Sequence, residues 1–256
     1  MGTAGPASTG MLPLTGERTV PGVPAENYWF RRHEAAYRFA LPLVEQRTVL
    51  EVGCGEGYGT ALLATAAARI VGMDYDTTTA AHAARTYPQA PFVRANLAAL
   101  PVPSESIDVV ATLQVIEHVW NHGEFVRECL RVLRPGGRLL VTTPNRLTFS
   151  PGLDEPVNPF HTKEFTAAEL TDLLVRNGFS VERVYGLHAG RRLRELDARW
   201  DSFVAAQLAS PPDAWDEALV QDVASIGPAD FEIAAAGELQ VDRSLDLVVL
   251  ARRPSD

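Results

Sequence analysis

Two groups of residues in this sequence have the types and the spacing that chemistry requires. The first is a glycine-rich run, Glu51-Val-Gly53-Cys54-Gly55-Glu-Gly57. Glycines at alternate positions let the backbone turn sharply and approach a ligand that a side chain would keep away. This spacing alone is a weak signal, because nucleotide-binding proteins and plain tight turns share it.

The second group combines a carboxylate with imidazoles. Glu117 and His118 are adjacent in the chain, and His161 follows within Asn158-Pro-Phe-His-Thr162. Imidazole binds several divalent metals, and oxygen ligands suit Mg²⁺ or Mn²⁺, so these three residues are candidate metal ligands. Glu117 and His118 are also candidate catalytic residues that could take a proton from a substrate. The pattern leaves open that His118 is a base, or a hydrogen-bonded loop residue, without any metal.

Seven predicted strands would bring these groups together. Apolar runs alternate with helical patterns, which indicates a mostly parallel sheet with helices on both faces. The glycine-rich run follows the first strand, Glu117 the fourth and His161 the fifth. Ligands of such sheets bind beyond the carboxyl ends of the strands, so we expect both groups at one site. The predicted strands cover residues 48–52, 69–74, 92–94, 107–113, 138–143, 180–185 and 246–251.

Helical patterns fill most of the segments between these strands. An amphipathic N-terminal helix is predicted over 27–40, with Pro42 at its end. Thr166 and Glu169 form a capping-box pattern. Residues 186–243 show helical stretches and few strand signals, so we expect a helical insertion before the last strand. Further helices are predicted over residues 58–68, 77–86, 123–133 and 166–177.

Composition limits the class of protein. The 256 residues are 46% hydrophobic and 21% charged, which is usual for a soluble globular protein. We expect a single domain over 15–256 after a disordered tail over 1–14. Two cysteines, Cys54 and Cys129, are too few for a disulfide framework and predict reduced thiols. The sequence shows neither a signal peptide nor an apolar run of roughly 20 residues, so we expect a cytoplasmic protein without a membrane partner.

The net charge of −9 argues against a nucleic-acid partner, because such proteins present a basic surface. The arginines in Arg31-Arg32 and Arg191-Arg192-Leu-Arg194 are therefore interpreted as residues of helix surfaces. His82 is likewise predicted to lie on a helix surface. His122 has no evident partner, and His188 could line an acceptor pocket.

Further residues after the predicted strands carry a family resemblance. Asp74 ends the second strand, where an acidic residue can bind both ribose hydroxyls, and Asn96-Leu97 follows the third. Together with the glycine-rich run and the turn Pro135-Gly-Gly137, they resemble the class I S-adenosylmethionine-dependent methyltransferases in order and spacing. Hydride transfer on a nicotinamide cofactor is the main rival, but it does not explain the Pro-Gly-Gly turn or the residues after the fourth strand.

This resemblance covers roughly residues 49–185 and the last strand. It implies a Rossmann-like, doubly wound α/β sheet with an antiparallel last strand, and S-adenosylmethionine as the methyl donor. Asp74 would bind the ribose, Asn96 and Leu97 the adenine, and Gln114 would lie beside the sulfonium. The family usually has an aspartate where Asn96 stands; asparagine keeps a donor and an acceptor. The residues implied to surround the methionine part are Glu51, Gly53, Cys54, Gly55 and Gly57.

Gln114-Val-Ile-Glu117-His118 and His161 resemble the metal-assisted methyltransferases of quinone biosynthesis and of small-RNA 3′ ends. Those families place Glu-x-x-Glu-His after the fourth strand and another histidine after the fifth. Gln114 replaces the first glutamate and is a weaker, neutral ligand. The implied ligands of Mg²⁺ or Mn²⁺ are therefore Glu117, His118 and His161.

Longer segments resemble the actinobacterial 1-O-methyltransferases of methylmannose polysaccharide synthesis. The resemblance implies a small oligosaccharide acceptor, a partly methylated mannoside, which is methylated at its reducing-end 1-hydroxyl. Five aromatic residues could stack on sugar rings or methyl groups: Tyr28, Trp29, Phe30, Phe149 and Phe160. Burial against the sheet edge is an equal alternative for them, and His33 could line the acceptor pocket. The segments are residues 14–19, 26–33, 144–151, 158–162 and 196–199.

Two other functions stay open on the sequence. One is a quinone or phenol O-methyltransferase, and the other is a regulatory protein that binds S-adenosylmethionine without catalysis. The insertion over 186–243 could close over the acceptor or build a homodimer.

Overall fold

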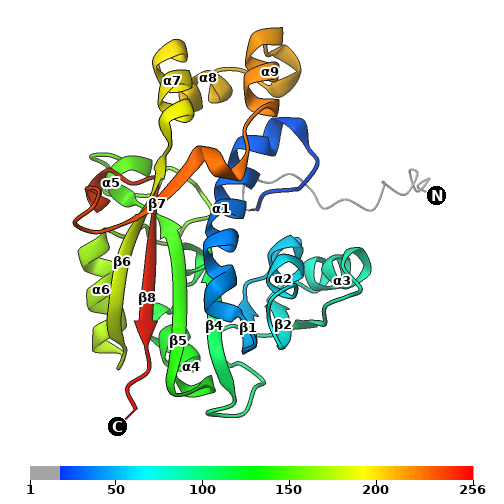
Figure 1. The fold of residues 1–256 in the computed structure, drawn as a ribbon, viewed down its shortest axis with the longest axis vertical. Helices are drawn as coiled ribbons and strands as arrows, with labels where there is room; N and C mark the ends of the chain where they lie inside the picture. The colour runs from blue at the N-terminus through cyan, green and yellow to red at the C-terminus, as the bar shows by residue number, and fades with distance from the viewer. Residues whose placement is uncertain (1–17, 256) are drawn as a thin grey trace, which may run out of the picture.

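One mixed sheet of eight strands forms the centre of the computed structural model, which describes residues 18–255 (Figure 1). The strand order is β3-β2-β1-β4-β5-β8-β6-β7, and β7 and β8 run antiparallel to the other six. The tail predicted over 1–14 lies outside the described residues. The strands are β1 (Thr48–Val52), β2 (Arg69–Asp74), β3 (Phe92–Arg94), β4 (Ile107–Leu113), β5 (Leu133–Pro144), β6 (Ser180–Ala189), β7 (Phe231–Ala235) and β8 (Asp246–Arg252).

Strand β7 corrects the predicted sheet of seven strands. It lies inside the segment that was expected to be helical and pairs antiparallel with β6, from Tyr185 opposite Ala235 to Ala189 opposite Phe231. Because β7 supplies hydrogen-bond partners, β6 continues to Ala189 instead of ending at Tyr185. Phe231-Glu-Ile alternates as a half-buried strand does, but the run is short and ends in two alanines, which favour helix.

The helices follow the predicted pattern with two corrections. α1 continues through Pro42 into its last turn, where a proline removes only one backbone hydrogen bond. α2 ends at Leu63, before the predicted end at residue 68. The capping box of Thr166 and Glu169 is present at the start of α6. The helices are α1 (Asn27–Val44), α2 (Tyr58–Leu63), α3 (Thr77–Thr86), α4 (His122–Val132), α5 (Arg146–Phe149), α6 (Ala167–Arg176), α7 (Arg191–Trp200), α8 (Phe203–Leu208) and α9 (Glu217–Ala224), with short 3-10 turns η1 (Pro24–Glu26), η2 (Ile116–His118), η3 (Pro212–Ala214), η4 (Pro228–Asp230) and η5 (Val241–Arg243).

Each face of the sheet has its own core. Helices α4 and α6 bury residues such as Phe125 and Leu170 on one face, and α1 and α2 bury residues such as Ala36 and Leu63 on the other. The turn Pro135-Gly-Gly137 lies at the start of β5, directly after α4. Cys54 and Cys129 are buried, and neither forms a disulfide.

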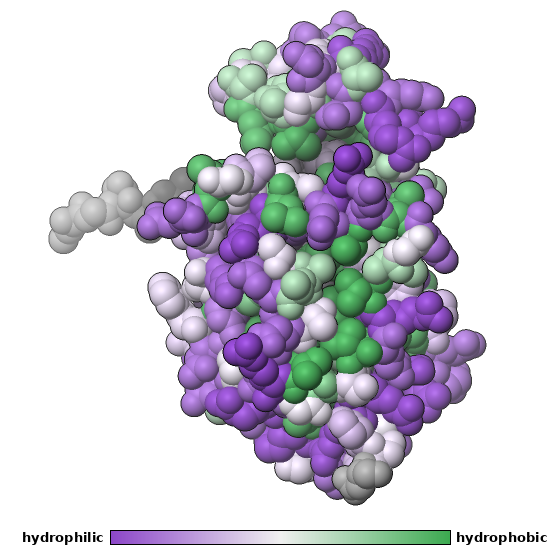
Figure 2. Space-filling model, turned by 90° about the vertical axis from the view of Figure 1, so that its left-hand side faces the viewer, coloured by the Kyte–Doolittle hydropathy of each residue, from purple (hydrophilic) through white to green (hydrophobic). Residues whose placement is uncertain are grey.

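Helices α7, α8 and α9 form a helical lobe above the carboxyl ends of the parallel strands (Figure 1). The lobe joins the body of the molecule through a narrower region with hydrophobic residues at its base (Figure 2). Leu193, Phe203 and Val223 from this lobe are buried in the core on the α1 face of the sheet. Among the described residues, no helix has the length and apolar character needed to cross a membrane.

Candidate functional site

Two adjoining cavities lie at the carboxyl ends of the parallel strands. The first, of about 610 Å³, is lined by the turn after β1 and is called the turn cavity. The second, of about 320 Å³, is lined by Glu117, His118 and His161 and is called the histidine cavity. Arg18, Gln114 and His118 line both cavities, so the two spaces meet at these side chains.

The turn cavity is built on backbone conformations that glycine permits. Gly53, Gly55 and Gly57 have φ angles of 84°, 50° and 92°, in the left-handed region. A Cβ atom on Gly53 would come within 2.4 Å of Val115 Cγ2, so the turn packs directly on the loop after β4. The N–H of Gly55 donates to Asp74 Oδ2 at 2.9 Å, which ties this turn to the end of β2.

The structure places six of the nine predicted cofactor residues on the wall of the turn cavity: Gly53, Gly55, Asp74, Asn96, Leu97 and Gln114. Glu51, Cys54 and Gly57 lie behind this wall. Glu51 is fully buried and accepts hydrogen bonds from the hydroxyls of Tyr37 and Thr60. Gly57 packs against α3, where an added Cβ would meet Ala83 at 2.7 Å. These residues support the conformation of the turn without lining the cavity.

Burial raises the pKa of Glu51 to about 7, against an ordinary value of 4.5. The folded state therefore binds this proton more tightly than the unfolded chain does. The stability that this adds is complete below about pH 4.5 and is lost as the pH rises through 7. We expect Glu51→Gln to reduce the pH dependence of the free energy of unfolding in this window by at most about 3 kcal/mol.

Urea unfolding at pH 4.5 and 7.5 checks this expectation. An amide at position 51 can still accept from Tyr37 and donate to Thr60 Oγ1, so the fold should survive. Glu45→Gln, at an exposed glutamate just after α1, is the matched control. An unchanged difference in unfolding free energy between the two pH values in the Glu51 variant would contradict the argument.

The three predicted metal ligands converge in the histidine cavity. One ligand atom each from Glu117, His118 and His161 lies within 4.8 Å of the others. Glu117 and His118 belong to η2, after β4, and His161 comes from the loop after α5. Thr162 joins the two segments, because its N–H and its hydroxyl both donate to the carbonyl of Glu117, at 2.6 and 3.0 Å.

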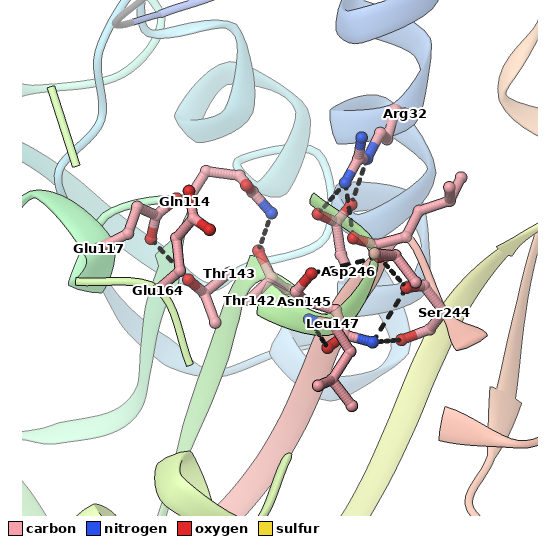
Figure 3. A network of polar contacts seen from close by, with 12 residues as sticks. Arg32, Gln114, Glu117, Thr142, Thr143, Asn145, Leu147, Glu164, Ser244 and Asp246 are labelled. Atoms are coloured by element: carbon pink, nitrogen blue, oxygen red, sulfur yellow. Dashed lines mark hydrogen bonds and ion pairs between the residues drawn. The ribbon is translucent and has the colours of Figure 1, made fainter. Parts of the chain in front are cut away.

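Each of the three side chains is oriented by a neighbour. Thr143 Oγ1 donates to Glu117 Oε2 at 2.9 Å (Figure 3). His118 Nδ1 lies 3.0 Å from the carbonyl oxygen of Phe160, and His161 Nδ1 lies 2.8 Å from Glu164 Oε1. Burial raises the pKa of Glu117 to about 8 and lowers the pKa of His161. Water is largely excluded from Glu117, which is 1% exposed.

Gln114 separates the two cavities in a strained conformation. Its φ is 58°, a region that few residues other than glycine occupy. Its N–H donates to the carbonyl of Thr142 at 2.9 Å and its side-chain amide donates to Thr142 Oγ1 at 3.2 Å (Figure 3). Strain held in this way often marks a functional position. The bonds to β5 fix Gln114 between the glycine turn and the metal-ligand candidates.

Helix α1 supplies one wall of the histidine cavity. Trp29, Arg32 and His33 line it, as their spacing on one helix face requires. Arg32, predicted to be a surface residue, is instead buried and donates to both oxygens of Asp246, at 2.6 and 2.7 Å (Figure 3). Burial lowers the pKa of His33 to about 4, so its ring is neutral near pH 7. Its Nδ1 lies 3.3 Å from the hydroxyl of Tyr58.

Other predicted acceptor residues do not line the histidine cavity. Tyr28 is 4% exposed and packs edge-on against Trp29 and Phe203 in the core. Phe160 is 42% exposed and contributes its carbonyl group to His118. His188 lies on β6, in register with Glu232 of β7, and lines neither cavity.

Sequence reasoning misplaced one histidine and missed several residues of the cavity walls. His82, predicted on a surface, is buried and pairs with Glu56 of the glycine turn at 2.6 Å. Leu208 from α8 reaches the histidine cavity from the helical lobe, which no local pattern indicates. Phe149, which was predicted to stack on a sugar, does line this cavity. The remaining residues of its wall are Arg18, Thr19, Glu26, Pro144 and Asn158, and those of the turn cavity are Tyr75, Ala98, Val115, Val119, Trp120 and Asn121.

Comparison with known proteins adds the following similarities. A model of the methyltransferase domain matches residues 50–141. A probable S-adenosylmethionine-dependent methyltransferase of Mycolicibacterium smegmatis is 53% identical, over 99% of this chain and 100% of that protein. One from Mycobacterium tuberculosis is 50% identical, over 98% of this chain and 93% of that protein. The ubiquinone biosynthesis O-methyltransferase of Caulobacter vibrioides is 35% identical, over 46% of this chain and 50% of that protein.

A solved structure shares the fold. The SAM-dependent methyltransferase of Thermotoga maritima aligns with a TM-score of 0.60 over 88% of this chain and 93% of that one. The sequence identity is 17%, so this likeness concerns the arrangement of helices and strands alone.

Proposed function

The chain belongs to the class I S-adenosylmethionine-dependent methyltransferases, and on this basis we propose that it methylates a sugar hydroxyl with the help of a divalent cation. The proposed acceptor is a small, partly methylated mannoside, and the proposed position is its reducing-end 1-hydroxyl. One observation carries the proposal: Glu117, His118 and His161 converge where the turn cavity meets a second cavity.

The turn cavity suits the methyl donor. Asp74 offers a carboxylate at the end of β2, where an acidic residue binds ribose hydroxyls. Asn96 and Leu97 line the same cavity and are proposed to flank the adenine. Gln114, held between the cavities, is proposed to lie beside the sulfonium, so that the methyl group faces the histidine cavity. Alignment of donor and acceptor lowers the barrier to transfer.

The donor set of the histidine cavity fits Mg²⁺ or Mn²⁺. Glu117 supplies a carboxylate, and protein oxygens engage the Nδ1 atoms of both histidines, so the Nε2 atoms are the proposed ligands. A bound divalent cation would polarise the acceptor hydroxyl and favour loss of its proton. Glu117 is proposed to take that proton, because its carboxylate lies within the same cluster and the bond from Thr143 to Oε2 holds it in place.

The histidine cavity offers both kinds of surface that a methylated sugar presents. Trp29 and Phe149 offer aromatic faces, while Arg18, Glu26 and Asn158 offer polar groups at the same wall. Quinone O-methylation remains the second candidate, since the chain shares 35% identity over about half its length with a ubiquinone biosynthesis O-methyltransferase.

An acceptor screen tests the proposed function. The purified protein is offered S-adenosylmethionine with methylated mannosides, unmethylated mannosides and phenols, and the methylated position is read by NMR. Transfer to the 1-hydroxyl of a methylated mannoside supports the proposal. Transfer to phenols alone supports the second candidate, and cofactor binding without transfer to any acceptor favours a regulatory protein.

Removal of divalent cations is expected to lower the rate of methyl transfer at least about 100-fold, because deprotonation of a sugar hydroxyl near neutral pH needs the polarisation that a cation provides. Activity is measured after dialysis against EDTA and after addition of Mg²⁺ or Mn²⁺. S-adenosylmethionine binding, followed by calorimetry, should change less than about threefold, since Asp74 and the glycine turn contain none of the proposed ligands. Full activity in EDTA would remove the metal from the proposal.

A further inference from the structure

Glu164 is a buried carboxylate beside the proposed metal ligands, and it has no role in the proposed reaction. It is 2% exposed, and its Oε1 lies 2.8 Å from His161 Nδ1. Its Oε2 is buried and has no hydrogen-bond partner within the described part of the chain. A buried carboxylate is costly, and the cap of the following helix is supplied by Thr166 and Glu169 instead. The fold alone therefore does not account for an acid at this position.

We propose that Glu164 is a positioning residue that orients His161 toward a divalent cation and offsets part of the charge of that cation. This inference rests on the metal site of the proposed function. Glu164 acts through His161 and is not counted among the ligands, because within residues 18–255 only Glu117, His118 and His161 bring their ligand atoms within 4.8 Å of one another.

The orientation follows from hydrogen-bond chemistry. An ionised carboxylate only accepts, so the bond to Glu164 places the ring hydrogen of His161 on Nδ1 and leaves Nε2 as the atom that coordinates. The carbonyl of Phe160 imposes the same choice on His118, because a carbonyl also only accepts. Both rings therefore place Nδ1 against the same loop, residues 158–164, which leaves Nε2 as the nitrogen for a cation.

The charge argument points to the same residue. Glu117 and two neutral imidazoles would carry one negative charge against the two positive charges of the cation. Gln114 cannot supply the second charge, because it is neutral and its amide donates to Thr142 (Figure 3). Glu164 lies near Glu117 (Figure 3) and supplies that charge in a place where water is excluded.

The loop that carries Glu164 is built to hold it in place. Thr162 donates to the carbonyls of Glu117 and Val119, so the loop is fastened to η2 on both sides of His118. Phe165, immediately after Glu164, is buried in the core. A carboxylate placed between two such anchors keeps its position when the cation binds, which is what an orienting residue requires.

The test uses full-length Glu164→Gln, which keeps the volume and an acceptor oxygen but removes the charge. Glu155→Gln, an exposed glutamate of the same loop region, is the matched control. Mn²⁺ binding is measured by electron paramagnetic resonance without acceptor, S-adenosylmethionine binding by calorimetry, and folding by thermal unfolding. We expect Glu164→Gln to bind Mn²⁺ about 10- to 100-fold more weakly, with cofactor affinity and folding close to those of wild type.

The outcomes separate this inference from the proposed function. Wild-type Mn²⁺ affinity in Glu164→Gln, together with lost affinity in Glu117→Gln, would overturn the role of Glu164 and leave the metal site standing. Absence of Mn²⁺ binding in wild type and in Glu155→Gln would overturn metal assistance and this inference with it. ¹H–¹⁵N spectra of the histidine rings give a second readout, since the Nδ1–H signal of His161 should shift in Glu164→Gln alone.

Discussion

Replacement of Glu117 by glutamine is expected to lower kcat for methyl transfer about 1000-fold. Glu117 is proposed both to take the acceptor proton and to bind the cation, and loss of a positioned base alone costs about 100- to 10,000-fold. The variant should fold, because the amide oxygen can still accept from Thr143 and the side chain keeps its volume. The measurement is the initial rate of methyl transfer at saturating concentrations of both substrates.

Cofactor affinity separates a catalytic effect from a general loss of structure. Glu117 lines the histidine cavity and not the turn cavity, so the Kd of S-adenosylmethionine should change less than about threefold in this variant. Glu45→Gln, at an exposed glutamate that lines neither cavity, should match wild type in both rate and affinity. A Glu117 variant that keeps a tenth or more of wild-type turnover would exclude it as the proton acceptor.

The parallel part of the sheet could be predicted because its strands are buried on both faces and read as continuous apolar runs. β1 to β4 have the predicted bounds, and the order of the strands alone brought Glu117 near His161. β7 could not be predicted in the same way, because an edge strand of five residues depends on its pairing with β6 more than on its own composition.

The errors on helix α1 have a geometric cause. Neighbouring residues of a helix point about 100° apart, so the aromatic run could not face the acceptor as a unit. Trp29, Arg32 and His33 share one face and line the histidine cavity, while Tyr28 points into the core. Helical spacing within the sequence could have separated Tyr28 from Trp29.

The buried ion pairs lay beyond sequence reasoning for a different reason. Arg32 pairs with Asp246, which lies 214 positions later in the chain. His82 of α3 pairs with Glu56 of the glycine turn. The sequence around a charged residue does not indicate whether its side chain is solvated or pairs with a distant carboxylate. The orienting contact of Glu164 likewise depends on how the loop over 158–164 folds back on η2.

Replacement of Gly53 by alanine is expected to weaken S-adenosylmethionine binding at least about 30-fold. At φ 84° a residue with a Cβ pays about 1–2 kcal/mol, and the new atom would lie 2.4 Å from Val115 Cγ2, an overlap that costs about 1–3 kcal/mol to relieve. The overlap can be relieved only by moving the glycine turn or the loop after β4, and both line the turn cavity. A cost of about 2 kcal/mol in the bound state corresponds to that loss.

Gly22→Ala is the matched control for this prediction, because Gly22 has nearly the same φ of 82° and open space where its Cβ would stand. It should share the cost of the backbone conformation in thermal unfolding but keep wild-type cofactor affinity. If both variants lose affinity equally, backbone strain and not the contact with Val115 controls the turn. If Gly53→Ala binds S-adenosylmethionine as wild type does, the packing of the turn on Val115 does not shape the donor site.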